Sequence, residues 1–362
     1  MAEISLCMIV RNEESVIDRC LSGIKDIADE IIIADTGSED ETKKIAAKYT
    51  DKIYDFKWID DFSAARNFSF SKAEKDYIMW LDADDVIDDA NKQKLIELKE
   101  KLGSGLSADM IMMKYHTAFD ENGAPTFSYF RERIVRRVMN YKWVGAVHEV
   151  IVPRGNVVYS DIAVMHKKLR TADPDRNIRI FEKLEKSGAS LDARQKFYYA
   201  RELYYHGRYA EAIDMFDRFF ECGDKWYENC ISACLDLSHC HMALGRRENA
   251  LESLFKSFFY DSPRAEICCE IGNIKLAEGK YREAAFWYET AAGTKPADQN
   301  GGFSSPDCRG YIPYMQLCVC YDRLGEYKKA WEFNEMAGKL KPHDKNFLAN
   351  KEYFSRLFES KK

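Results

Sequence analysis

Short apolar runs alternate with amphipathic stretches over the first third of the chain. Four of these runs are rich in β-branched and aromatic residues and predict buried strands, and each is followed by a stretch with helical periodicity. Asn12 is expected to cap the first of these helices, and Asp88 or Asp89 the fourth. The β-α-β-α order predicts a parallel sheet covered by helices, with ligands bound beyond the carboxyl ends of the strands. The predicted strands are residues 4–10, 30–35, 52–56 and 77–82.

The pattern changes after the fourth helix, where the apolar runs indicate strands without intervening helices. Residues 109–119 and 126–137 flank a turn that contains Asn122 and Gly123, and an Asn-Gly pair is a strong hairpin signal. Residues 156–166 predict a further pair of strands. The first half is therefore expected to be a parallel α/β core that is extended by antiparallel strands.

A helical repeat occupies the second half of the chain. Four glycines each stand five residues before an alanine, and they recur at intervals near the roughly 34-residue length of a tetratricopeptide repeat. Residues 293–308 interrupt the array and are expected to form a loop. Arrays of this kind present a concave surface that binds peptides or proteins. The glycine and alanine pairs are Gly207 and Ala212, Gly245 and Ala250, Gly279 and Ala284, and Gly325 and Ala330.

The two halves define the predicted domain organisation. Residues 1–172 are expected to form the α/β domain, and residues 191–362 an all-α tetratricopeptide solenoid of about four repeats. Residues 173–190 are expected to link them as a helix that ends at Gly188, since glycine commonly follows the last turn of a helix.

Cysteine and histidine side chains cluster in the second predicted repeat. Their spacing fits no zinc finger or zinc ribbon, and several of them recur at helical spacing. Buried cysteines behave as small apolar residues, so core packing is favoured over a metal site. The cluster comprises Cys230, Cys234, His239, Cys240 and His241.

Composition excludes several classes of partner. The 54 Lys and Arg against 60 Asp and Glu give a net charge of −6, so no basic field indicates nucleic acid or an anionic membrane. No stretch approaches the roughly 18 apolar residues of a transmembrane helix, and the N-terminus does not resemble a signal peptide. The eleven cysteines are therefore expected to be free thiols in a reducing cytoplasm.

Three acids, Asp82, Asp84 and Asp85, follow the fourth predicted strand. Acids at this position can simply cap the next helix, and an Asp-x-Asp triplet is by itself a weak signal. However, carboxylates at the carboxyl end of a buried strand also suit Mg²⁺ or Mn²⁺, which joins protein oxygens to the phosphates of a substrate. A divalent cation would relieve the repulsion between these carboxylates.

A set of motifs in a characteristic order resembles one enzyme family. They are IVRNEE (9–14), IIIADTGSEDET (31–42), DFSAARN (61–67), LDADD (81–85) and WVGAVHE (143–149). Together they resemble the GT-A fold of family 2 glycosyltransferases, which is a Rossmann-like fold that binds nucleotide-sugars. The resemblance implies a glycosyltransferase activity of the hexosyltransferase type (EC 2.4). With the repeats, the whole chain is similar to the repeat-bearing members of that family, which include the peptide S- and O-glycosyltransferases that modify glycosylated bacteriocins.

The resemblance implies a UDP-sugar donor and residues that bind it. Asp35 stands where the family's second-strand aspartate accepts a hydrogen bond from uracil, although an Asp in DTGS also caps a turn. Arg66 would lie near the diphosphate, and Arg133 or Arg136 could clamp it, although solvated charges are an equal alternative for this last pair. The implied donor-binding residues are Arg11, Glu13, Asp35, Arg66, Asp82 and Arg133.

The resemblance also implies the metal ligands and the catalytic base. Asp82, Asp84 and His166 would hold Mn²⁺ or Mg²⁺, with Asp85 behind them. Inverting transfer needs one carboxylate to take the proton of the acceptor, and Glu149 is the candidate for this role. His148 is the alternative base, or it would orient the acceptor. Trp143 could stack on a sugar, although tryptophan is more often part of a core.

The acceptor remains open between several classes. A peptide or protein side chain held partly by the repeats is the first hypothesis. A glycan or lipid-linked precursor of a surface polymer is the second, and an inactive domain that serves as a repeat-based scaffold is the third. The chain lacks both the Gln-x-x-Arg-Trp motif of the cellulose-synthase branch and an apolar span, which disfavours a membrane polymerase. The sequence also leaves open a homodimer formed through the repeats.

Overall fold

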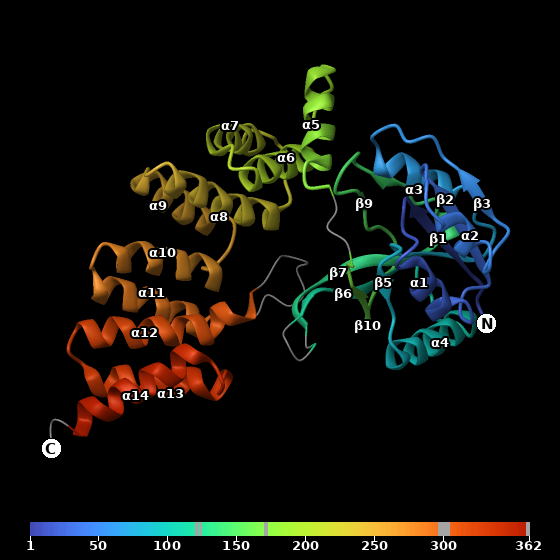
Figure 1. Cartoon of the computed structure of the whole chain (residues 1–362). Coiled ribbons are helices and arrows are strands. Elements are labelled where there is room, and N and C mark those ends of the chain that lie inside the picture. The colour runs from blue at the N-terminus through green and yellow to red at the C-terminus, as the bar shows by residue number, and fades with distance from the viewer. Residues whose placement is uncertain (120–122, 124, 170–172, 296–304, 360–362) are drawn as a thin grey trace. The chain divides into compact units, whose positions relative to one another are not determined.

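The chain forms two compact units, Met1–Leu191 and Asp192–Lys362 (Figure 1). The computed structural model describes residues 1–119, 123, 125–169, 173–295 and 305–359. Asn122 of the predicted hairpin turn and most of the predicted loop at 293–308 lie outside the described residues. The first unit is a sheet with helices, and the described part of the second unit is helical, as the sequence predicts.

The first unit contains the four predicted parallel strands. They are β1 (Ile4–Val10), β2 (Glu30–Asp35), β3 (Ile53–Asp55) and β4 (Tyr77–Trp80). β1 pairs in parallel with β2 and β4, and β2 pairs in parallel with β3, so this prediction is confirmed.

Both faces of this sheet are buried, which explains the continuous apolar runs. Leu6 and Met8 of β1 belong to one core cluster, whereas Cys7 belongs to a second cluster with Phe70 and Trp80. Successive side chains of a strand point to opposite faces, so a strand covered on both sides needs apolar residues at every position.

Two longer strands extend the core, and a third differs from the prediction. β7 (Pro125–Arg136) is antiparallel to β4 and to β6 (Met110–Phe119), as expected. The prediction of a strand pair at 156–166 is wrong, because β10 (Val157–His166) is one strand that runs parallel to β6 with a register shift midway. The irregularity of this strand explains why its pattern resembles two strands.

A short strand, β5 (Asp85–Val86), closes the sheet at the edge that carries the acids. It pairs antiparallel with β10 and places His166 opposite Asp85. The strand order is β3-β2-β1-β4-β7-β6-β10-β5. Residues that are about eighty positions apart in the sequence are thereby neighbours on one edge.

Four helices alternate with these strands. They are α1 (Ile17–Ile24), α2 (Thr42–Ala46), α3 (Phe62–Phe70) and α4 (Asp89–Gly103). Asp88 caps α4 as predicted, since its Oδ1 accepts a hydrogen bond from the backbone N–H of Asn91 at 2.9 Å.

Asn12 does not cap the first helix, so that prediction is wrong. α1 begins at Ile17, and no side chain of the described residues caps it. Asn12 has a φ of 56°, its N–H donates to Ser38 Oγ at 3.0 Å, and its Oδ1 accepts from the N–H of Glu39 at 2.8 Å. The side chain therefore ties the loop after β1 to the loop after β2.

The first unit also includes the helix predicted as a linker, α5 (Arg176–Lys186). Gly188 follows it with a φ of +75°, and Ile178, Ile180 and Phe181 are buried. The remaining elements of this unit are η1 (Arg137–Met139), β8 (Trp143–Val144) and β9 (Val150–Ile151).

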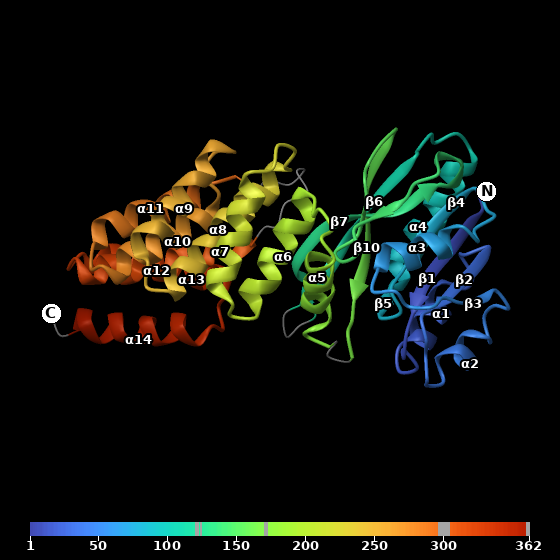
Figure 2. The ribbon, with the colours of Figure 1, turned by 90° about the horizontal axis from the view of Figure 1, so that it is seen from above.

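The second unit consists of stacked helix pairs followed by one more helix (Figure 2). Each repeat glycine lies between the two helices of a pair with a φ of +70 to +77°, and the alanine five residues later is fully buried. The pairs are α6 (Ala193–Tyr205) with α7 (Tyr209–Phe220), α8 (Tyr227–Ala243) with α9 (Arg247–Lys256), α10 (Ala265–Ala277) with α11 (Tyr281–Gly293), and α12 (Tyr311–Arg323) with α13 (Tyr327–Leu340). The last helix is α14 (Lys345–Glu359), and two short 3₁₀ helices, η2 (Ser257–Phe259) and η3 (Pro306–Arg309), complete the described part of this unit.

The cysteines of the second repeat belong to its core. Cys230, Cys234 and Cys240 are buried free thiols, and burial raises the pKa of Cys234 and of Cys240 to about 12. Core packing is therefore the correct interpretation. Among the described helices, none is both long and apolar enough to cross a membrane.

Candidate active site

The acids after β4 differ sharply in their surroundings. Asp85 is fully buried, and its carboxylate accepts hydrogen bonds from the Tyr115 hydroxyl at 3.0 Å, the Arg133 guanidinium at 2.9 Å and the Asp82 N–H at 3.0 Å. Burial of a charge is tolerated only where such partners compensate it. Asp85 is therefore a fixed part of the loop that positions Asp82 and Asp84.

Arg133 lies beneath the site and does not line its opening. Its side chain is fully buried, and its guanidinium lies 3.8 Å from the Trp80 ring centroid and 4.3 Å from that of Tyr115. The expected contact between Arg133 and the donor is therefore replaced by an ion pair with Asp85. Arg136 also faces elsewhere, since it pairs with Asp109 at 3.6 Å.

A cluster of potential metal ligands lies at the end of β10. Ligand atoms of Asp84, Asp85 and His166 all lie within 4.8 Å of one another, and no other such group occurs among the residues that the structure describes. His166 Nδ1 is 3.1 Å from Asp84 Oδ1 and 3.4 Å from Asp85 Oδ1. Burial lowers the pKa of His166, but these two carboxylates outweigh it and raise that pKa to about 9.

This donor set fits a divalent cation. Carboxylate oxygens with one imidazole suit Mn²⁺, and Asp84 and His166 are only partly buried. Asp85 stands in the cluster where Asp82 was expected, and a metal contact by Asp82 stays a prediction.

Arg66 joins the candidate base to the acid loop. Its Nε donates to Glu149 Oε1 at 2.6 Å and its Nη2 to Asp82 Oδ1 at 2.7 Å. The guanidinium contacts the rings of both Trp80 and Trp143, at 4.7 and 4.8 Å from their centroids. Burial would raise the pKa of Asp82, but the charges of Arg66 and Arg133 lower it. Arg66 therefore holds both carboxylates in place through its two hydrogen bonds.

Trp143 belongs to the core and is not available to stack on a sugar. It is only 2% exposed and packs edge-on against Trp80 and Phe70, with centroids 5.0 and 5.8 Å away. Together with Trp80, it forms the aromatic surface that Arg66 contacts.

Asp35 at the end of β2 accepts hydrogen bonds through only one of its two carboxylate oxygens, among the residues that the structure describes. Its Oδ1 accepts the N–H groups of Gly37 at 3.0 Å and Ser38 at 2.9 Å, which is the predicted turn-capping role. Its Oδ2 is buried and has no hydrogen-bond partner among the described residues. A buried, unpaired carboxylate oxygen is costly unless a ligand supplies a donor.

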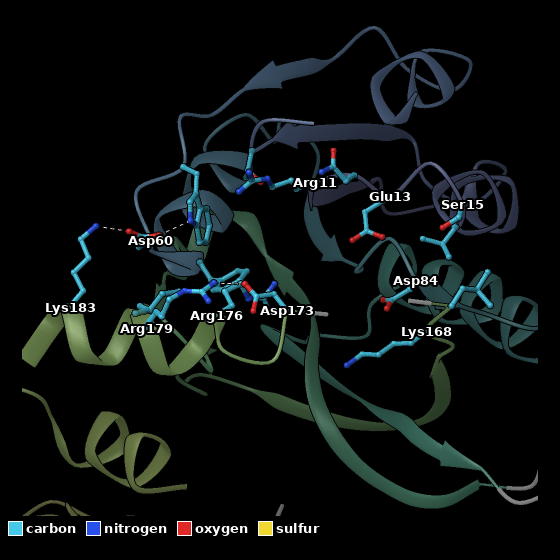
Figure 3. Close-up of a pocket in the computed structure, with 17 residues that line it drawn as sticks. Arg11, Glu13, Ser15, Asp60, Asp84, Lys168, Asp173, Arg176, Arg179 and Lys183 are labelled. Atoms are coloured by element: carbon cyan, nitrogen blue, oxygen red, sulfur yellow. Dashed lines mark hydrogen bonds and ion pairs between the residues drawn. The ribbon is translucent and has the colours of Figure 1, made fainter. Parts of the chain in front are cut away.

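Two cavities meet beyond the strand ends. The larger, about 850 Å³, is lined by Arg11, Glu13 and Asp84 and extends to α5 (Figure 3). The smaller, about 430 Å³, is lined by both candidate bases, His148 and Glu149. The lining residues of the smaller cavity that carry the chemistry are Arg66, Asp82, Asp84, His148, Glu149 and His166.

Sequence reasoning missed several residues that line these cavities. Arg131 reaches the Glu149 carbonyl at 3.3 Å from β7, and Lys168 and Arg176 line both cavities. Arg131 and Arg133 lie in one stretch of alternating charge, which predicts a charged strand. The sequence gives no signal for which of the two arginines lines the cavity. Arg176 lies on a helix that the sequence indicated only as a linker.

Comparison with known proteins agrees with this geometry. Residues 5–150 match the model of glycosyl transferase family 2, and residues 265–298 match a tetratricopeptide repeat. The chain is 29% identical over 221 residues to the SPbeta prophage-derived glycosyltransferase SunS of Bacillus subtilis, which covers 57% of this chain and 50% of that protein.

Two further relatives match shorter segments. The chain is 51% identical over 85 residues to a TPR repeat-containing protein of Synechococcus elongatus, covering 24% of this chain and 21% of that protein. It is 25% identical over 159 residues to the lipopolysaccharide core biosynthesis glycosyltransferase LpsC of Rhizobium meliloti, covering 42% of this chain and 58% of that protein. The chain thus spans about half the length, or less, of the first curated relatives that it matches. Residues 5–150 form a glycosyl transferase family 2 domain, and the chain joins this domain to C-terminal tetratricopeptide repeats.

Proposed function

We propose that the chain is an inverting glycosyltransferase that moves a sugar from a UDP-sugar to a peptide or protein side chain with the help of Mn²⁺ or Mg²⁺. One observation carries the proposal. The Asp84–Asp85–His166 cluster and the Glu149–Arg66–Asp82 bridge meet at the same strand ends, within a domain of this family. A candidate cation site next to a held carboxylate suits metal-assisted transfer from a nucleotide-sugar.

The donor would lie along the ends of β1, β2 and β4. Asp35 Oδ2 is buried and unpaired among the described residues, so it can accept the ring N–H of uracil. Arg11 and Glu13 border the larger cavity. Asp84 and His166 would hold the divalent cation, which when bound supplies positive charge to the departing diphosphate.

Glu149 is the residue that would take the acceptor's proton. Its Oε1 accepts a hydrogen bond from Arg66, and this bond orients the carboxylate while leaving Oε2 for the acceptor. Direct displacement on the face opposite the leaving diphosphate inverts the anomeric carbon and needs a single base. His148 lines the same cavity and has a strained φ of 52°, which suits an acceptor-orienting role beside Glu149.

The repeats support a peptide or protein acceptor, because such arrays bind extended chains. A second candidate is a precursor of a surface glycan, which the similarity to LpsC of lipopolysaccharide core biosynthesis favours. Incubation with both acceptor classes separates the two candidates.

The test is metal-dependent hydrolysis and transfer with a panel of UDP-sugars. The wild-type chain should bind UDP with Mn²⁺, and Asp84→Ala should lose this metal dependence. Glu149→Gln should bind UDP as the wild type does yet lose about 10²–10⁴-fold in transfer rate, since it removes the base and keeps the shape of the side chain. If UDP does not bind with any metal, the proposed function is wrong. If Glu149→Gln still transfers at the wild-type rate, Glu149 is not the base.

A further inference from the structure

The cations that line the two cavities differ in their partners. Most of these lysines and arginines already contact other protein groups, as shown by the ion pairs of Arg66, Arg131, Arg179 and Lys183 and by the contacts of Arg176 with Phe62 and Asn177. Arg11 and Lys168 also line both cavities. Within the described part of the chain, neither of these two side chains has a hydrogen bond or an ion pair. Both are therefore available to an anionic ligand.

The position of Lys168 is set by the metal-ligand cluster. β10 ends at His166, two residues before Lys168. The backbone N–H of Lys167 donates to the Asp84 carbonyl at 3.1 Å, and the Lys167 carbonyl accepts from Arg19 Nη2 at 2.8 Å. The backbone that precedes Lys168 is thus fastened to the acid loop, and the Lys168 side chain extends beside Asp84 into the larger cavity (Figure 3). A lysine ammonium on its flexible stem can therefore reach an anion bound next to the candidate cation site.

Arg11 lies at the opposite end of the proposed donor site. It follows Val10, which is the neighbour of Asp35 in the parallel ladder between β1 and β2. Asp35 is the proposed acceptor for the uracil N–H, so Arg11 lies near the nucleoside. β10 lies on the other side of β1, beyond β4, and carries Lys168 at its end. In a UDP-sugar the α-phosphate is next to the nucleoside and the β-phosphate is next to the sugar, so the order of the two cations matches the order of the two phosphates.

The β-phosphate is the group on which negative charge develops during transfer. The bond between the anomeric carbon and the β-phosphate oxygen breaks, and its electron pair stays on that oxygen. The acceptor oxygen or sulfur forms the new bond to the anomeric carbon, and its proton passes to Glu149. A cation placed at the β-phosphate stabilises the transition state more than the bound donor, because the charge grows as the bond breaks. The carboxylates of Asp84 and Asp85 would offset part of the charge of a bound divalent cation, so a further positive charge favours the departing phosphate.

We propose that Lys168 binds the β-phosphate of the donor and stabilises the leaving diphosphate. This inference rests on the proposed function and assigns a further catalytic residue to the same site. Lys168 lies beyond residues 5–150, the part of the chain that the family model matches. Arg11 serves the α-phosphate, and the two cations therefore contribute differently to the binding of UDP and UMP.

The test measures the affinity of the full chain for UDP and UMP in the presence of Mn²⁺ by calorimetry. Lys168→Gln should weaken UDP binding about 10-fold or more and UMP binding by less than about 2-fold, since only UDP has the β-phosphate and a hydrogen bond between charged groups contributes this much. Arg11→Gln should weaken the binding of both nucleotides to a similar extent. Lys168→Arg, which keeps the charge, should retain most of the affinity for UDP.

Hydrolysis of the UDP-sugar supplies a second readout. At saturating donor, Lys168→Gln should lower kcat by about 10-fold or more, because the lost interaction strengthens in the transition state. Lys57→Gln is the matched control, since Lys57 is exposed and precedes the lining residue Trp58 but lies outside both cavities. This variant removes the same charge from the chain and should keep the wild-type affinity and kcat. Lys168→Gln should also keep the wild-type Tm, because the Lys168 side chain is exposed.

The possible outcomes separate this inference from the proposed function. Equal losses of UDP and UMP affinity in Lys168→Gln would assign Lys168 to the α-phosphate and overturn the inference. Wild-type UDP affinity in Lys168→Gln, or an equal loss in Lys57→Gln, would overturn it while leaving the proposed function intact. If the wild-type chain binds no UDP with any metal, the proposed function and this inference are both wrong.

Discussion

Replacing Arg133 by Met tests whether the buried ion pair with Asp85 organises the acid loop. Both side chains are 0% exposed and their atoms lie 2.9 Å apart. Methionine fills a similar volume without charge, so the change leaves the Asp85 carboxylate buried without its guanidinium partner and with the Tyr115 hydroxyl, the Asp82 N–H and the His166 imidazole as its remaining partners. Removal of one partner of a buried pair costs about 3–5 kcal/mol, because the remaining charge is uncompensated.

For a unit of this size, each kcal/mol corresponds to roughly 2–4 °C in Tm, so the first unit should lose roughly 6–20 °C. Hydrogen exchange of peptides from β4 and β7 measures this unit separately from the repeats, since exchange reports local free energies of opening. Arg136→Met is the matched control on the same strand. Its side chain is 45% exposed and pairs with Asp109 at 3.6 Å, so its loss should cost less than about 1 kcal/mol.

A second variant separates lost charge pairing from lost packing. Asp85→Asn combined with Arg133→Met removes both charges of the ion pair, and the double variant should be about 1–3 kcal/mol more stable than the sum of the single changes predicts. If Arg133→Met is no less stable than Arg136→Met, or if the double variant is simply additive, the ion pair does not organise the loop.

Two further predictions concern the repeats. His239 Nε2 lies 3.7 Å from Glu270 Oε2, and this interaction raises the pKa of His239. Burial would raise the pKa of Glu270, but the interaction with His239 lowers it. The raised pKa of His239 stabilises the unit below its ordinary value of 6.5, and the lowered pKa of Glu270 stabilises it above its ordinary value of 4.5. Urea unfolding should therefore show a stabilising contribution between these two pH values that is lost at lower and at higher pH. The contribution should be absent in His239→Gln and present in the control His343→Gln, which changes an exposed histidine. Gly279→Ala should lower the free energy of unfolding in urea by about 1 kcal/mol, because Gly279 has a φ of +73° while no neighbouring atom would clash with the added methyl group. The control Gly293→Ala, within α11, should leave the stability unchanged or raise it. Equal effects of the two changes would show that backbone conformation is not the cause.

The first three strands and the repeat could be predicted because local patterns decide them. A strand covered on both faces must be apolar throughout, and a helix pair needs a tight turn and a small residue at its crossing, so β1 and the Gly279–Ala284 pair carry their own signals. The pattern of β10 misled because a register shift interrupts its alternation, and an interrupted strand reads as two.

For the candidate site, the sequence predicted which residues lie near one another better than it predicted the contacts that they make. The rule that ligands bind at strand ends placed Asp35 and Asp84 at the same edge, and β2 and β4 do run in parallel on either side of β1. It could not indicate that Arg66 reaches Glu149, which follows 83 residues later, because that contact depends on how α3 packs. Arg133 was misassigned for a specific reason: the ladder passes from the Ile111–Ile134 pair to the Met112–Glu132 pair, so Arg133 sits in a bulge that turns its side chain into the core.

The charges of the site explain why three acids can lie together after β4. Four carboxylates, those of Asp82, Asp84, Asp85 and Glu149, surround the meeting point of the strands, and two buried guanidinium groups, those of Arg66 and Arg133, pair with three of them. The formal balance of these six groups is two negative charges, and Asp84, the carboxylate that neither arginine contacts, is also the one beside His166. A divalent cation bound there would supply two positive charges beside Asp84 and His166. The arginines therefore hold three carboxylates in fixed orientations, and the fourth, with its imidazole partner, is the place where a divalent cation would bind.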